Sequence, residues 1–327
     1  MTSETTLPKI TVILCTHNRV QSLALALKSI ATQILPQSVD WEILVVDNNS
    51  SDETRQIVED LARRYPRIQY LFESKQGISQ ARNLGIRHAR GEILAFIDDD
   101  ETASSDWLWN LTANLDSSEW SGAGGRVVAK WSCSRPRWLS DQSHLTSAPL
   151  AMFDRGTEAG ELNDVAGANM AFRKEVFDVH GGFRTDLGRV GTGLLSGEES
   201  EFCRRIIASG RRLRYEPSAV TYHPVGESRV RQKYFLEWWF NKGRSDVVEF
   251  GAQANHMPVF GVPLRLFRGL IANSLRWMVT VEPSQRFICK LKTWACAGQI
   301  SEHYHQTFKK KIRAQRSSNL SPPADGS

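Results

Sequence analysis

The chain has 327 residues, 41% hydrophobic and 24% charged, which is enough apolar content for one large or two modest folded domains. Its five cysteines form no CxxC pair, so neither a disulfide framework nor a zinc site is indicated. Residues 1–8 lack the apolar stretch of a secretory signal, and we expect a cytoplasmic protein.

The net charge of +5 is unevenly distributed along the chain. From Val225 onward there are 16 Lys or Arg against 7 Asp or Glu, whereas residues 1–224 carry 25 against 29. The C-terminal basic residues are interleaved with Trp, Phe, Leu and Ile at helical spacing. This pattern favours a membrane surface or a protein partner over nucleic acid.

The first hundred residues alternate apolar strands with amphipathic helices. Strands are predicted over 9–16, 41–47, 68–73 and 92–97, and helices over 19–33, through 57–65 and over 77–89. This alternation predicts an α/β sheet with parallel strands. The second half is less regular, with strands predicted near 121–130, 165–172, 213–215 and 219–222, and helices over 174–180 and 198–209. The intervening Gly-rich segment 181–197 has the length of a functional loop.

Several predicted strands end in polar residues. The apolar run 92–97 is followed by four acids, Asp98 to Glu101, which require counter-charge from a divalent metal or basic side chains unless they form a solvated loop. Because carboxyl ends of parallel strands meet at one sheet edge, Thr16, Asp47 and Asp98 should face one crevice. No GxGxxG follows the first strand and no GxxxxGK[ST] occurs, which disfavours dinucleotide and P-loop sites.

Seven ordered segments of residues 10–224 resemble the motifs of family 2 glycosyltransferases. They are CTHNR (15–19), VVDNNSSDET (45–54), KQGISQARNLGI (75–86), ILAFIDDD (93–100), GANMAFR (167–173), GEESEFCRRIIASG (197–210) and AVTYHP (219–224). The resemblance implies a GT-A fold, here a mixed sheet flanked by helices, together with a nucleotide-sugar donor, Mg²⁺ or Mn²⁺, and inversion at the anomeric carbon.

The resemblance also implies donor-side roles. Thr16, Asn18 and Arg19 would shape the nucleoside pocket, and Asp47 would accept a hydrogen bond from the base, expected to be uracil of a UDP-sugar. An ionised acceptor at a strand end suits an imide N–H. Arg82 would lie near the nucleotide, the alternative being a surface arginine paired with an acid.

Asp98, Asp99 and Asp100 fit the DXD motif of the family. By resemblance Asp98 would face the ribose or the metal and Asp100 would bind the metal, while Asp99 either joins them or points away. Carboxylate and phosphate oxygens suit Mg²⁺ or Mn²⁺. His223 matches a histidine that approaches the metal in some relatives, with a structural histidine as the alternative.

Glu198 and Glu199 open a predicted helix, whose N-terminal dipole favours ionised acids. The family usually has Glu-Asp here, and the second acid is the base that deprotonates the acceptor. The side chain of Glu199 is one methylene longer than the usual aspartate. Either the acceptor therefore lies farther out, or Glu198 acts as the base instead. Gly167, Ala168 and Asn169 match the loop that borders the sugar and the acceptor.

We expect three parts in the chain: a catalytic domain over 1–224, a helical amphipathic extension over 225–308, and a disordered tail over 309–327. Within the extension, Arg265, Arg268 and Arg276 lie on one side of a predicted helix. Each would cost about 2.5 to 3.5 kcal/mol at a bilayer centre, which disfavours a membrane span. We expect peripheral contact with the inner face of the cell membrane, the alternative being packing on the catalytic domain.

These motifs together predict a metal-dependent inverting glycosyltransferase that moves a sugar from a nucleotide-diphosphate donor to a hydroxyl of a glycan or lipid-linked acceptor. Transfer should be non-processive, because no QxxRW block follows the acidic helix. The alternatives are a sugar-nucleotide pyrophosphorylase, which would need a Gly-rich lysine-bearing loop after the first strand, and a catalytically inactive nucleotide-binding scaffold at a membrane surface.

Overall fold

A computed structural model describes the chain except residues 1–8, 140–142, 192, 252–257, 260 and 319–327. The chain divides into two compact units, Met1–Arg231 and Gln232–Ser327.

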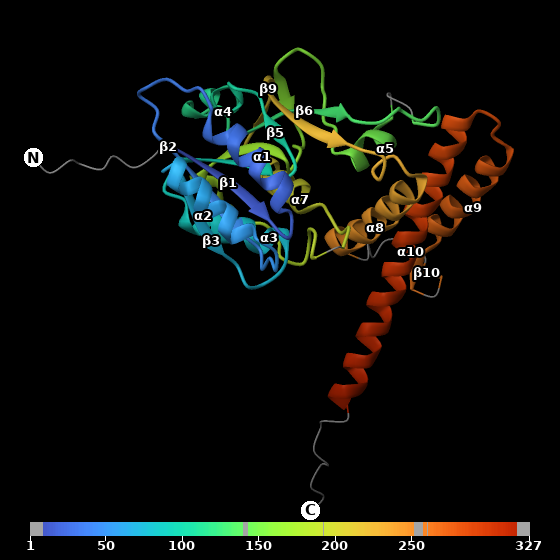
Figure 1. Cartoon of the computed structure of the whole chain (residues 1–327). Coiled ribbons are helices and arrows are strands. Elements are labelled where there is room, and N and C mark those ends of the chain that lie inside the picture. Colours follow the sequence, from blue (N-terminus) through green and yellow to red (C-terminus); the bar gives the residue numbers. More distant parts are fainter. Residues whose placement is uncertain (1–8, 140–142, 192, 252–257, 260, 319–327) are drawn as a thin grey trace, which may run out of the picture. The chain divides into compact units, whose positions relative to one another are not determined.

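The first unit is built on one mixed sheet with strand order β3-β2-β1-β4-β8-β6-β9-β5, to which β7 adds by pairing with β9 (Figure 1). Its parallel part consists of β1 (Ile10–Thr16), β2 (Trp41–Asp47), β3 (Ile68–Phe72) and β4 (Ile93–Asp98). The remaining strands are β5 (Thr102–Ala103), β6 (Gly122–Trp131), β7 (Gly160–Leu162), β8 (Asn169–Arg173) and β9 (Leu213–Val225). Because β8 runs antiparallel to both β4 and β6, the expected mixed sheet is confirmed.

Helices cover both faces of this sheet. Val12 and Leu14 of β1 pack with α1 (Val20–Ala31), α2 (Thr54–Arg64) and α4 (Trp107–Thr112). Ile13 of β1 packs on the opposite face with α3 (Ile78–His88), α6 (Lys174–His180) and α7 (Glu198–Ala208). Burial of both faces explains why the central strands are continuous apolar runs. Short helical segments complete the unit: η1 (Ala113–Asp116), α5 (His144–Ser147) and η2 (Ala148–Leu150).

Strand β9 is continuous where the sequence predicted two short strands. Pro217 and Ser218 suggested a break, but β9 accommodates them in a bulge: Gly125 of β6 pairs with Glu216, and Arg126 pairs with Val220. The strand therefore continues past the bulge to His223 and Val225.

The second unit is helical, with α8 (Gln232–Phe250), α9 (Leu264–Val279), α10 (Pro283–Ser318) and a small hairpin of β10 (Pro258–Val259) and β11 (Val262–Pro263). Helices α8 and α10 approach closely through two glycines. A Cβ atom at Gly243 would collide with the carbonyl of Ala295, and one at Gly298 with the carbonyl of Phe240.

The described helices of this unit bear on the disordered tail expected at residues 309–327 and on the expectation that the extension does not span a membrane. The disorder expected from residue 309 is replaced by helix as far as Ser318, because Lys, Arg, Ala and Gln are good helix formers; residues 319–327 lie outside the described residues. None of the described helices is both long and apolar enough to cross a membrane.

Candidate active site

Three loops at the carboxyl edge of the parallel strands are joined by asparagine side chains. The backbone N–H of Asn18 donates to the hydroxyl of Ser50 (3.0 Å), and Asn18 Oδ1 accepts from the backbone N–H of Ser51 (2.7 Å). Asn18 has a φ of 52°, a region that asparagine tolerates better than most residues. Asn48 Oδ1 accepts from the backbone N–H of Gly77 (2.7 Å). These bonds fix the loops that follow β1, β2 and β3 to one another.

Asp47 ends β2 and is nearly covered by its own chain. Its Oδ1 accepts from the backbone N–H of Ser50 (2.9 Å), and its Oδ2 accepts from the hydroxyl of Tyr70 (2.8 Å). Burial and the bond to Asp47 raise the pKa of Tyr70, so the hydroxyl remains a donor. A nucleobase N–H would be a third donor to this carboxylate, using a remaining lone pair.

The three aspartates after β4 have different surroundings. The side chain of Asp98 is 41% exposed, whereas those of Asp99 and Asp100 are 8% and 15% exposed. Asp99 accepts from the hydroxyl of Thr16 (2.8 Å) and from Nη1 of Arg19 (3.0 Å). Burial raises the pKa of Asp99 to about 7 despite the charge of Arg19. Thr16 and Asp99 thus support the loop from within, while Asp98 is the aspartate most open to a ligand.

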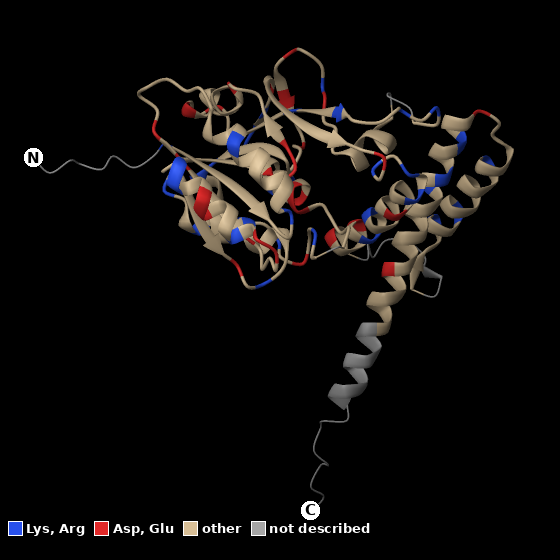
Figure 2. Cartoon of the chain, in the orientation of Figure 1, with Lys and Arg blue, Asp and Glu red and all other residues tan. Residues whose placement is uncertain are grey.

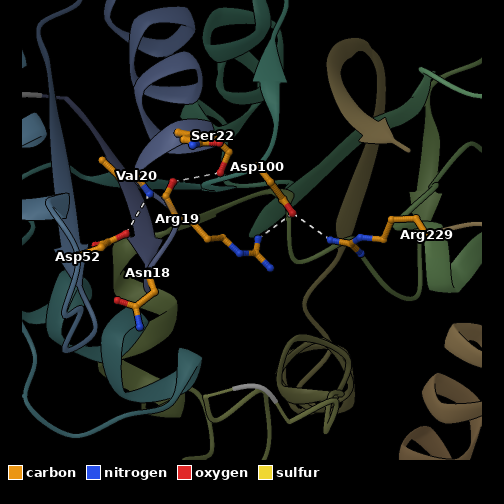
Figure 3. A pocket seen from close by; sticks show the side chains of 8 residues that line it. Asn18, Arg19, Val20, Ser22, Asp52, Asp100 and Arg229 are labelled. Atoms are coloured by element: carbon orange, nitrogen blue, oxygen red, sulfur yellow. Dashed lines mark hydrogen bonds and ion pairs between the residues drawn. The ribbon is translucent and has the colours of Figure 1, made fainter. Parts of the chain in front are cut away.

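Asp100 is bound by two arginines, and Figure 3 shows this arrangement. Its Oδ2 accepts from Nη1 of Arg19 (2.7 Å) and from Nη2 of Arg229 (3.1 Å). Burial alone would raise the pKa of Asp100, but Arg19, His223 and Arg229 together lower it. A pocket of about 520 Å³ opens beside these groups, lined by Asn18, Arg19, Val20, Gln21, Ser22, Asp52, Asp100 and Arg229.

The sequence reasoning missed Arg229. The arginine lies in a turn shortly after β9, and its partner Asp100 is 129 positions away. The one signal in the sequence is the onset of basic residues after Pro224. That signal indicates a basic C-terminal part of the chain and does not single out Arg229.

Arg82 of α3 is buried and contacts both Asp98 at the end of β4 and Glu198 at the start of α7. Its Nη1 donates to Oε1 of Glu198 at 2.7 Å, and both side chains are over 90% buried. Its Nη2 donates to the carbonyl of Gly167 (3.0 Å) and lies 3.5 Å from Oδ1 of Asp98. A buried pair of this kind is stable only with both charges present. Glu198 is therefore the ion-pair partner of Arg82.

Glu199 differs from its neighbour. In the described part of the chain, no other side chain forms a hydrogen bond or ion pair with its carboxylate. Its withdrawal from water, reinforced by the charge of Glu198, raises the pKa of Glu199 to about 8. A Cβ atom at Gly167 would lie 3.0 Å from Nη2 of Arg82 and 3.5 Å from Cδ of Glu199, so glycine permits their close approach.

Asn169 lies in the interior of the sheet instead of facing the crevice. It is fully buried, accepts from the indole N–H of Trp107 (2.8 Å) and donates to the carbonyls of Ala219 (2.8 Å) and Arg126 (3.0 Å). Ala168 is also buried. The side chain of Asn169 thus holds β6, β8 and β9 together.

Asp100 and His223 offer oxygen and nitrogen atoms that could bind a divalent ion. Nε2 of His223 is 3.8 Å from Oδ2 of Asp100, which is too long for a hydrogen bond. Burial lowers the pKa of His223 to about 4, so its imidazole is neutral, as a metal ligand must be. Among the described residues, no group of three or more His, Cys, Asp or Glu could hold an ion alone. The donor set fits Mg²⁺ or Mn²⁺ that also binds ligand oxygens.

A mixed sheet with acids along its carboxyl edge and an acidic helix beside them is the architecture of GT-A-like glycosyltransferases. The mannosyltransferase PcManGT from Pyrobaculum calidifontis, solved in complex with GDP-Man and Mn²⁺, shares this fold with a TM-score of 0.56. It is 21% identical in sequence, and the match covers 98% of this chain and 82% of that one.

Sequence comparison gives the family. Residues 11–181 match the model of glycosyl transferase family 2, and the chain belongs to that family. It is 29% identical over 236 residues to the succinoglycan biosynthesis protein ExoM of Rhizobium meliloti, covering 71% of this chain and 72% of the relative. It is 26% identical over 238 residues to a glucosyl-dolichyl phosphate glucuronosyltransferase of Haloferax volcanii, covering 71% and 74%. The predicted glycosyltransferase activity is confirmed, and the pyrophosphorylase alternative is wrong.

Proposed function

We propose that the protein is a metal-dependent, inverting and non-processive glycosyltransferase that uses a nucleotide-diphosphate sugar. The observation that carries the proposal is the set of contacts of Arg82, which pairs with Glu198, bonds to the carbonyl of Gly167 and lies 3.5 Å from Oδ1 of Asp98. Beside this cluster, Glu199 has no side-chain partner among the described residues. Intact acids on both the proposed donor side and the proposed acceptor side argue against an inactive scaffold.

On the donor side, Asp100 and Asp98 would hold Mg²⁺ or Mn²⁺ together with the diphosphate, and His223, whose Nε2 is 3.8 Å from Oδ2 of Asp100, would join them. Such an ion would act as a Lewis acid that stabilises the charge on the departing nucleoside diphosphate. Asn18 and Arg19 line the pocket beside Asp100, where the nucleoside would bind.

On the acceptor side, Glu199 would take the proton from the attacking hydroxyl. Glu198 is held in the ion pair with Arg82, whereas no other side chain in the described part of the chain pairs with Glu199, which makes Glu199 the better candidate for the base. A pKa of about 8 makes the carboxylate a stronger base than an ordinary glutamate. Direct attack by the activated hydroxyl in a single displacement would invert the anomeric configuration.

We propose UDP as the nucleotide, with uracil recognised at Asp47, on the strength of the family motif. PcManGT was solved with GDP-Man, so both nucleotides belong in the test. For the acceptor we propose a glycan or a lipid-linked saccharide. The Haloferax volcanii relative is named for a dolichyl phosphate substrate, and ExoM for succinoglycan biosynthesis.

We propose further that α9 contacts an anionic lipid surface on the cytoplasmic side of the membrane. Four apolar residues of α9 are each more than half exposed: Ile271, Leu275, Met278 and Val279. Exposed Arg268 and Arg276 lie alongside them, and basic residues recur along α9 and the first part of α10 (Figure 2). An apolar strip bordered by arginines matches the headgroup region of an acidic bilayer.

The experiment that tests the function is a donor screen by nucleotide release with UDP- and GDP-sugars, followed by calorimetry of the selected nucleotide with and without Mn²⁺. Binding should be enhanced by the metal, and Asp100→Ala should abolish the enhancement. Binding that is equally tight with and without metal would remove the ion from the proposal.

A further inference from the structure

Arg229 and Asp100 form an ion pair at the position proposed for the metal. Nη2 of Arg229 donates to Oδ2 of Asp100 at 3.1 Å, and Nη1 of Arg19 donates to the same oxygen at 2.7 Å (Figure 3). Both Arg229 and Asp100 are largely withdrawn from solvent, with side-chain exposures of 21% and 15%.

One carboxylate oxygen cannot serve these arginines and a divalent ion equally. Both lone pairs of Oδ2 are used by the two guanidinium groups, and an ion bound at either oxygen of Asp100 would face two nearby positive charges. A bound diphosphate would compete with Asp100 for the arginines, because guanidinium groups bind phosphate oxygens at least as well as they bind a carboxylate.

Both arginines are also held by contacts other than the one to Asp100. Arg19 also donates to Oδ1 of Asp99 (3.0 Å), so it retains an anionic partner if Asp100 turns to a metal. Arg229 lies in a turn, where its backbone N–H donates to the carbonyl of Gly226 (3.0 Å). A turn residue with a long side chain can reach a different partner without disturbing the sheet.

We propose that Arg229 is a positioning residue that controls metal binding. In the donor-free enzyme it pairs with Asp100. When the donor binds, Arg229 pairs with the diphosphate instead, and Asp100 can then bind the metal ion. Metal and diphosphate then bind with positive coupling, and part of that coupling comes from Arg229. The inference rests on the proposed metal-dependent function.

The test is titration of full-length protein with Mn²⁺, followed by electron paramagnetic resonance, with and without saturating pyrophosphate. Arg229→Gln removes the charge and Arg229→Lys keeps it, while Arg231→Gln changes an exposed arginine of the same segment as a matched control. Circular dichroism checks that each variant is folded.

Without pyrophosphate, Arg229→Gln should bind Mn²⁺ about 10- to 150-fold more tightly, since a charged hydrogen bond to Asp100 is lost. The gain in Mn²⁺ affinity on adding pyrophosphate should shrink by at least that factor. Arg229→Lys and Arg231→Gln should stay within about 2-fold of the wild type.

Three results would overturn the inference. Unchanged or weaker Mn²⁺ binding by Arg229→Gln without pyrophosphate refutes it alone and leaves the proposed function intact. An equal effect of the Gln and Lys variants would show that Arg229 acts through shape and not through charge. Failure of the wild type to bind Mn²⁺ even with pyrophosphate refutes both this inference and the proposed metal.

Discussion

The buried ion pair of Arg82 and Glu198 permits a quantitative prediction. Replacing Arg82 with Met keeps most of the side-chain volume but leaves Glu198 as a buried carboxylate with no counter-charge at 2.7 Å. It also removes the donor to the carbonyl of Gly167. The change therefore tests whether the centre of the site depends on charge compensation.

Breaking a buried pair by removing one partner costs about 3 to 5 kcal/mol. In a protein of this size each kcal/mol shifts Tm by about 2 to 4 °C, so Arg82→Met should lower Tm by about 6 to 20 °C. Glu198→Gln removes the orphaned charge, and the double variant should recover about 2 kcal/mol or more relative to Arg82→Met alone.

The assay is differential scanning calorimetry of the full chain, with Arg126→Met as the control. Arg126 pairs with Asp154 at 2.6 Å, but their side chains are 35% and 40% exposed, so this pair should contribute only about 0 to 1 kcal/mol. If Arg82→Met cost no more than Arg126→Met, or if the double variant were as unstable as the single one, the reasoning would be refuted.

Three further predictions address the base, the helical unit and the membrane surface. Glu199→Gln should bind the donor nucleotide normally but reduce turnover by about 10² to 10⁴, and undiminished turnover would place the base elsewhere. Because the pKa of Glu199 lies at about 8 and the base acts when deprotonated, kcat/KM of the wild type should rise with pH through about 8 and level off above it. Gly298→Val should destabilise the second unit by about 1 to 3 kcal/mol or more in urea denaturation, because its side chain meets the carbonyl of Phe240, whereas Gly160→Ala, with open space around it, should be nearly neutral. The double variant Leu275→Glu/Met278→Glu should reduce co-sedimentation with anionic vesicles; Leu25→Glu, at another exposed leucine, should not, and equal loss in both would contradict a specific role for α9.

The sequence allowed the parallel core and its acidic edge to be predicted, because β1, β2 and β4 are buried on both faces and read as apolar runs ending in polar residues. Periodicity does not reveal pairs formed across the chain. Arg82 and Glu198 are 116 positions apart, and their contact gives the two neighbouring glutamates different surroundings.

The position of a residue within a sequence motif predicts the direction of its side chain less well than the apolar runs predict the strands. Asn169 sits inside a recognised block, yet its amide points into the sheet and bonds to Trp107 and to two backbone carbonyls. The outcome depends on the antiparallel pairing of β8, which no local pattern encodes. Likewise, Pro217 suggested the end of a strand, but β9 continues past it through a bulge. The sequence of β9 alone does not predict the bulge, because a bulge also depends on the neighbouring strand.

The bulge in β9 also determines how far along the sheet His223 reaches. It leaves residues 217–219 without partners on β6, so His223 stands opposite Ala129. In an unbroken ladder His223 would lie three positions farther along, about 10 Å away at the rise of a strand. Because three is odd, its imidazole would also point to the other face of the sheet. The length of this one irregular segment therefore decides whether the histidine can meet Asp100 at all.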